Sequence, residues 1–84
     1  MSESVLLEAE RLVNGERAES YGDMKENWQK VTNVFNALTS RDLTVKESIF
    51  FMYAVKLVRE EYQHKRDNPV DLAGYSQVLQ RVQE

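Results

Sequence analysis

The feature that most constrains this fold is an unbroken apolar run, Ile-Phe-Phe-Met-Tyr-Ala-Val, at residues 49–55. Thr44 and Glu47 form a capping-box pattern just before it, which predicts the start of a helix. The cap and the length of the segment, which continues to about Gln63, favour a helix over a buried strand. Because its middle is apolar all round, we expect this helix to be covered on several sides.

The size of the chain limits how that cover can be supplied. A chain of 84 residues buries only about 60–65% of its unfolded surface, so a monomer is expected to be marginally stable. No cysteine and one histidine are present, so disulfides and Cys/His metal sites are excluded. We therefore expect a homo-oligomer in which a second copy covers part of helix 45–63.

Two further amphipathic helices are predicted before this one. The first covers 4–14, with Ser2 or Ser4 as its cap and Asn14-Gly15 as a left-handed stop. The second begins at Asp23, which forms an acidic capping box with Glu26. Each has an apolar stripe at helical spacing, and both stripes are expected in the core: Val5, Ala9, Leu12 and Val13 in the first, and Met24, Trp28, Val31, Phe35 and Leu38 in the second.

A last helix is predicted from Asn68-Pro69, with asparagine as cap and proline at the first helical position. Its apolar residues include Val70 and Val78. Gly74 lies inside it, where glycine costs about 1 kcal/mol relative to alanine, so we expect another backbone or a ligand to approach closely. The sequence thus predicts an all-α, compact bundle of about four helices, one domain over residues 1–84, and oligomeric.

Charge and targeting signals narrow the function. A net charge of −3 argues against nonspecific nucleic-acid binding, although a few cations suffice for a small phosphorylated ligand. The first residues lack a signal-peptide pattern, and the apolar run is too short to cross a bilayer. A cytoplasmic location and no membrane partner are therefore expected.

Two cations and two carboxylates form the first candidate site. Lys56 and Arg59 share one helical face, and Asp67 and Asp71 flank the start of the next helix. An antiparallel hairpin of these helices would bring all four together. They would form either a structural salt-bridge network or a site in which cations meet phosphate and carboxylates meet a ribose, a base edge or a metal.

The segment between the first two helices holds the second candidate site. Gly22 permits a tight turn before a helix N-terminus, which attracts anions, although Asp23 competes for the same amides. Arg17 could bind phosphate and Tyr21 could stack on a base. Alternatively, Arg17 is solvated and Tyr21 packs against the bundle. Asn27 lies off the apolar stripe of its helix. Tyr75, like Tyr62, could serve in the core, at an interface or as a stacking group.

The order and spacing of these residues resemble a small phage and prophage family of unknown function. The shared pattern is Tyr-Gly-Asp at 21–23, Asn-Trp at 27–28, Lys56 with Arg59, and Asp67 followed by Asp-Leu-Ala-Gly-Tyr at 71–75. A more distant similarity is to nucleotide-modification-associated phage proteins and MazG-type nucleotide pyrophosphohydrolases, which implies a nucleotide-like ligand. The MazG-type enzymes hold magnesium through Glu-x-x-Glu pairs, which helix 45–63 lacks.

Three hypotheses follow. In the first, the protein binds a nucleotide or nucleotide-derived ligand, for counter-defence or phage nucleotide metabolism, without catalytic residues or a cofactor. In the second, it is an interaction module that inhibits a host enzyme. In the third, it is a minimal MazG-like pyrophosphohydrolase that uses Mg²⁺ at Asp67 and Asp71. The predicted ligand-binding set is Arg17, Tyr21, Gly22, Asn27, Lys56, Arg59, Asp67, Asp71 and Tyr75.

Overall fold

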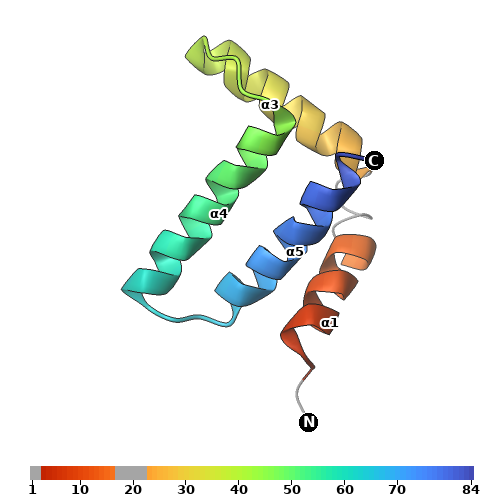
Figure 1. Cartoon of the computed structure of the whole chain (residues 1–84), viewed down its shortest axis with the longest axis vertical. Helices are drawn as coiled ribbons and strands as arrows, with labels where there is room; N and C mark the ends of the chain where they lie inside the picture. The colour runs from red at the N-terminus through yellow and green to blue at the C-terminus, as the bar shows by residue number, and fades with distance from the viewer. Residues whose placement is uncertain (1–2, 17–22) are drawn as a thin grey trace.

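A computed structural model describes residues 3–16 and 23–84, and over these ranges it contains helices and no strand (Figure 1). The elements are α1 (Val5–Arg11), a π-helical turn η1 (Leu12–Glu16), α3 (Met24–Thr39), α4 (Val45–Tyr62) and α5 (Asp67–Arg81). The all-helical prediction with about four helices is confirmed for this part of the chain.

The hairpin of α4 and α5 is the centre of the fold. The two helices lie antiparallel and side by side, α1 lies along the other side of α5, and α3 crosses the end near the C-terminus (Figure 1). The core cluster is formed by Ile49, Tyr75 and Val78, with Trp28 among the residues packed against it. The Cα radius of gyration is 13.6 Å, above the roughly 12 Å of a compact domain of this length, so the bundle is more open than predicted.

The predicted helix starts are confirmed at three places by side-chain caps. Ser4 Oγ accepts from the backbone N–H of Leu7 at 3.1 Å. Asp23 Oδ1 accepts from that of Lys25 at 2.9 Å, so Asp23 caps α3 through Lys25 and not through the capping box predicted with Glu26. Thr44 Oγ1 accepts from the N–H of Glu47 at 3.1 Å, while Glu47 Oε1 accepts from the N–H of Thr44 at 3.0 Å. Each cap satisfies a helix amide that would otherwise lack a partner.

Two predicted helix ends are wrong. Asn14-Gly15 is no left-handed stop, because the chain continues through it as η1. Asn68 is not the cap of the last helix, which already begins at Asp67, so Pro69 is its third residue rather than its first. Asn68 is instead buried, and its Nδ2 donates to Glu60 Oε1 at 3.0 Å. Its amide thus ties α5 to α4 rather than capping its own helix.

The seam between α1 and α5 explains the interior glycine. Ala9 and Val13 of the first stripe are buried, as predicted, and Val70 is buried on α5. A Cβ added to Gly74 would lie 3.3 Å from Val13 Cγ2. The close approach expected at Gly74 is therefore made by the side chain of Val13 in η1.

The apolar stripe of α3 is only half used, which corrects its prediction as a core stripe. Trp28 packs on the core, but Val31, Phe35 and Leu38 are 47%, 40% and 81% exposed. The reason is geometric: α3 runs away from α4 and α5 (Figure 1). Thr32 is the buried polar residue of α3. Its Oγ1 lies 2.8 Å from the Trp28 carbonyl oxygen and 3.0 Å from Ser48 Oγ of α4.

The apolar middle of α4 is covered by its own chain on one side. Ile49 is fully buried, whereas four large apolar side chains elsewhere on the helix are 50–67% exposed: Phe50, Phe51, Leu57 and Val58. The structure thus agrees with the inference that three partner helices in so short a chain cannot surround this one.

Candidate functional site

A buried ion pair joins α4 to α5. Lys56 Nζ lies 2.6 Å from Asp71 Oδ2, and the two side chains are only 10% and 12% exposed. The antiparallel hairpin brings them together, as the sequence predicted. Removing two charges from water is costly, so each partner depends on the other to remain buried and ionised. The salt-bridge interpretation of the four-residue cluster is therefore correct for this half of it.

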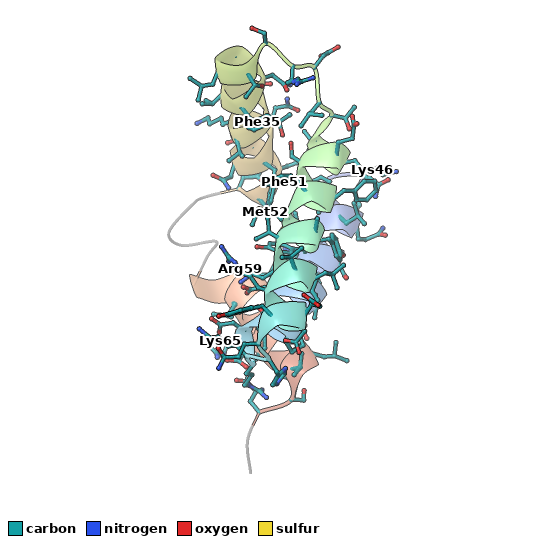
Figure 2. The ribbon with its side chains drawn as sticks, turned by 90° about the vertical axis from the view of Figure 1, so that its left-hand side faces the viewer. Phe35, Lys46, Phe51, Met52, Arg59 and Lys65 are labelled. Atoms are coloured by element: carbon teal, nitrogen blue, oxygen red, sulfur yellow. The ribbon has the colours of Figure 1, made fainter. Side chains whose placement is uncertain are left out.

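A cavity opens beside the ion pair, at the end of the hairpin. It has a volume of about 530 Å³. Its lining residues are Lys56, Val58, Arg59, Tyr62, Gln63, Lys65, Asp67 and Asn68. Arg59 and Lys65 are exposed cations, Asp67 is acidic, and the charge of Lys56 is balanced by Asp71. The two exposed cations attract anions to the cavity. Figure 2 shows Arg59 and Lys65 projecting to the same side of α4.

The walls of the cavity combine charge with apolar surface. Arg59, Lys65 and Asp67 are exposed, so their charged groups are available to a ligand. Tyr62 is 88% exposed and Val58 is 67% exposed, which leaves an aromatic face and an aliphatic surface beside the cations. Such a mixture suits a ligand with an anionic group and a planar apolar part.

Hydrogen bonds fix the loop that forms the floor of this site. Asn68 bonds to one carboxylate oxygen of Glu60, and His64 Nδ1 lies 2.5 Å from the other. The bond from Asn68, followed by that from His64, holds the pKa of Glu60 below its usual value of 4.5. His64 itself is exposed.

Tyr75 lies in the core rather than at this cavity. It is 9% exposed. Its ring meets Trp28 edge-on at a centroid distance of 6.3 Å and Tyr53 at 6.0 Å. Trp28 is thus a core residue, as expected, and Tyr62 is the tyrosine that faces the cavity.

The remaining predicted residues lie elsewhere. Asn27 is half-buried near the start of α3, which lies close to the C-terminus, at the opposite end of α5 from the α4–α5 loop (Figure 1). The structure therefore does not bring Asn27 to the cavity. Arg17, Tyr21 and Gly22 lie outside the described residues, and their role stays a prediction.

Sequence reasoning did not single out Lys65 or Asn68 as site residues. Lys65 lies between the two predicted helices, after Gln63 and before Asn68, and Asn68 was assigned to a helix cap. The signal that could have found Lys65 is the concentration of basic residues in this part of the sequence, where Arg59 is followed by Lys65 and Arg66. Only the hairpin geometry shows which of them faces the cavity.

The described residues can also be considered as metal ligands and as membrane-spanning segments. Across residues 3–16 and 23–84, no group of three or more His, Cys, Asp or Glu side chains is placed to share a metal ion. No helix in the same ranges combines the length and apolar character that a membrane-spanning segment needs.

Fold and site together define a small all-helical protein with a basic cavity at the end of a helical hairpin. The family model "Domain of unknown function (DUF6378)" matches residues 4–83, and the chain belongs to this family. No solved structure matches it.

Two curated relatives are bacteriophage proteins. The chain is 35% identical over 82 residues to the Gene 55 protein of Mycobacterium phage L5, covering 95% of this chain and 53% of the relative. It is 33% identical over 85 residues to the Gene 55 protein of Mycobacterium phage D29, covering 100% of this chain and 56% of the relative. The chain spans about half the length of these relatives. The resemblance to a phage family of unknown function is confirmed.

Proposed function

We propose that the cavity at the end of the α4–α5 hairpin binds a nucleotide or a nucleotide-derived ligand. The observation that carries the proposal is the presence of two exposed cations, Arg59 and Lys65, around one cavity of about 530 Å³. The chain as a whole carries a net charge of −3. A local excess of cations on an acidic protein favours a specific small anion over a nucleic-acid backbone.

Each lining residue has a role in this proposal. Arg59 offers a planar fork of donors for phosphate, and Lys65 adds a second mobile cation. Tyr62 provides an exposed face on which a base stacks. Asp67 accepts hydrogen bonds from a sugar or a base edge. Lys56, paired with Asp71, forms part of the cavity wall.

The phage origin of the two relatives suggests a biological setting for this proposal. A phage protein with such a pocket would act in the host cytoplasm, either by sequestering a host defence signal or by serving phage nucleotide metabolism. A nucleotide is also the ligand that the resemblance of the sequence to MazG-type proteins would imply. Under the enzyme alternative, Asp67 and Asp71 would hold Mg²⁺, and Asp71 would have to exchange Lys56 for the metal.

The proposal is tested by calorimetric and NMR titration with ADP, AMP, adenosine and ribose 5-phosphate. We expect the phosphorylated compounds to shift amide signals in residues 58–68, adenosine to bind more weakly, and added salt to weaken binding. Arg59→Ala/Lys65→Ala is expected to reduce affinity at least tenfold. The matched control is Arg41→Ala/Lys46→Ala, which removes two exposed cations near the other end of α4 and should leave binding unchanged.

Three results would count against this proposal. Absence of binding by all four compounds at millimolar concentration would contradict it, as would binding that survives Arg59→Ala/Lys65→Ala. Magnesium-dependent release of pyrophosphate from nucleoside triphosphates would replace simple binding with the enzyme hypothesis.

One observation favours a second candidate function, an interaction module that inhibits a host enzyme. Large apolar side chains are exposed on both α3 and α4, including Leu38 at 81% and Phe51 at 61%. Contiguous exposed apolar surface is typical of protein contact sites. A blank nucleotide titration, together with stoichiometric binding of one purified host enzyme, would support this function over the first.

A further inference from the structure

The exposed side of α4 carries a stripe with a coiled-coil repeat. Phe51, Val55, Val58 and Tyr62 follow one another at intervals of four, three and four residues, which places them along one face of the helix. Phe51, Val58 and Tyr62 are 61%, 67% and 88% exposed, and Val55 is partly buried. No charged residue interrupts these four positions. The stripe has the composition of a helix–helix seam that lacks its second helix.

We infer that this α4 stripe, defined as Phe51, Val55, Val58 and Tyr62, docks against the same stripe of a second copy of the chain. A two-fold contact requires a surface that complements itself. In an antiparallel alignment the aromatic residue at each end meets the aromatic residue at the other end of the partner helix. The two valines of each copy then meet near the axis.

Charge selects the antiparallel alignment. In a parallel pair, Arg59 would lie beside its own counterpart, and Lys65 likewise, which places like charges side by side. In the antiparallel pair, the end with Arg59 and Lys65 lies beside the N-terminal end of the partner helix. Glu47, four residues before Phe51 and on the same face, stands at that end and is exposed.

The available area just reaches what a stable dimer needs. Figure 2 shows Phe35 of α3 and Phe51 of α4 on the same side of the molecule, so the exposed part of α3 extends the surface. With aromatic side chains burying about 150–250 Å² each, the exposed fractions of the α4 stripe and of Val31, Phe35 and Leu38 amount to at most about 800 Å² per copy. A standard interface buries about 800 Å² per partner, so the dimer would have to cover nearly all of this surface.

The contact also changes the proposed binding site. Val58 and Tyr62 belong both to the stripe and to the lining of the cavity. In the antiparallel pair, the N-terminal half of the partner helix lies next to these two residues and forms a further wall. One face of the Tyr62 ring then packs on the partner helix, and the base of a bound ligand would stack on the opposite face. This consequence rests on the proposed nucleotide binding, whereas the self-association does not.

The test measures oligomeric state by light scattering after gel filtration and by sedimentation equilibrium. The wild-type chain is expected at twice its chain mass at micromolar concentration. Phe51→Glu/Val58→Glu is expected to weaken dimerisation at least 100-fold while circular dichroism shows unchanged helix content, because both side chains are exposed in the single chain. Leu57→Glu, on a different face of α4 and 56% exposed, is the matched control and should remain dimeric.

Orientation is tested by cross-linking, which is simple because the chain has no cysteine. Mixing Glu47→Cys with Lys65→Cys under oxidising conditions is expected to give mainly the mixed 47–65 disulfide, whereas a parallel pair would give 47–47 and 65–65. If the wild-type chain is still a monomer at a protein concentration on the order of 100 μM, the inference is overturned. So would a dimer that survives Phe51→Glu/Val58→Glu or is lost in Leu57→Glu. Loss of nucleotide binding in a protein that still dimerises would refute only the proposed function.

Discussion

Lys56 of α4 and Asp71 of α5 form an ion pair of 2.6 Å in which both side chains are about nine-tenths shielded from water. The pair is one of the features that hold the hairpin together at the edge of the basic cavity. It also fixes part of the cavity wall, since Lys56 is one of its lining residues.

Replacing Asp71 by asparagine is expected to destabilise the protein by about 3 kcal/mol, because the buried ammonium of Lys56 loses its counter-charge. Urea denaturation followed by circular dichroism measures the change. Asp42→Asn, at an exposed position before α4, serves as control and should change stability by less than about 0.5 kcal/mol. The double variant Lys56→Met/Asp71→Leu should recover most of the loss. If it is no more stable than Asp71→Asn, the charge argument is wrong.

The sequence predicted the helices well because their signals are local. Caps such as Thr44 and stripes such as Ala9 with Val13 depend on residues within one or two turns. The pairing of Lys56 with Asp71 was also accessible, since an antiparallel hairpin of two adjacent helices fixes which ends meet. These features need no knowledge of how distant segments pack.

The errors arose where tertiary contacts override local preference. Asn68 has the local pattern of a cap, but a carboxylate on the neighbouring helix, Glu60, binds its amide instead. The α3 stripe has the pattern of a core helix, yet the crossing direction of α3 leaves Phe35 and Leu38 outside. Periodicity identifies an apolar face but does not tell whether the same chain covers it.

The Glu60 carboxylate is expected to make stability depend on acidic pH. Its folded pKa lies below its usual value of 4.5, mainly through the hydrogen bond from Asn68 and then that from His64. The unfolded state therefore binds the proton more readily. This contribution is present above the unfolded pKa and is lost as pH falls from about 4.5 through the lower folded value.

Unfolding by urea at several pH values between 3 and 7 measures that dependence. Glu60→Gln is expected to flatten the slope of stability against pH in the acidic part of this range. Glu61→Gln, the exposed neighbour, should leave the wild-type slope nearly unchanged. Equal slopes in wild type and Glu60→Gln would show that the Asn68 bond does not discriminate between the two protonation states.

Ser40 ends α3 in the left-handed conformation, with φ 56° and ψ 35°. A side chain there is strained, whereas glycine adopts this region without penalty. Ser40→Gly relieves this strain in the folded state but gives the unfolded chain more conformational freedom. The net effect is expected to stabilise the protein by about 0.5–1 kcal/mol. The melting temperature should rise by roughly 4 °C. Thr39→Gly, one residue earlier and still helical, should lower stability by a similar amount.

Gly74 and Val13 are expected to be energetically coupled, because a Cβ at position 74 would lie only 3.3 Å from Val13 Cγ2. Alanine in place of glycine gains about 1 kcal/mol of helix propensity, but at this seam the added methyl pushes Val13, which is 4% exposed, out of its packing. We expect Gly74→Ala to be destabilising in the wild type and stabilising in the Val13→Ala background, where the methyl fills the vacated space.

A double-mutant cycle of urea unfolding at one protein concentration measures the coupling, expected at about 1 kcal/mol or more. Gly15→Ala, where an added Cβ meets no atom within 4 Å, should behave the same in both backgrounds. Strictly additive effects of Gly74→Ala and Val13→Ala would mean that helix propensity alone, and not the approach of the first helical segment to α5, sets the preference at residue 74.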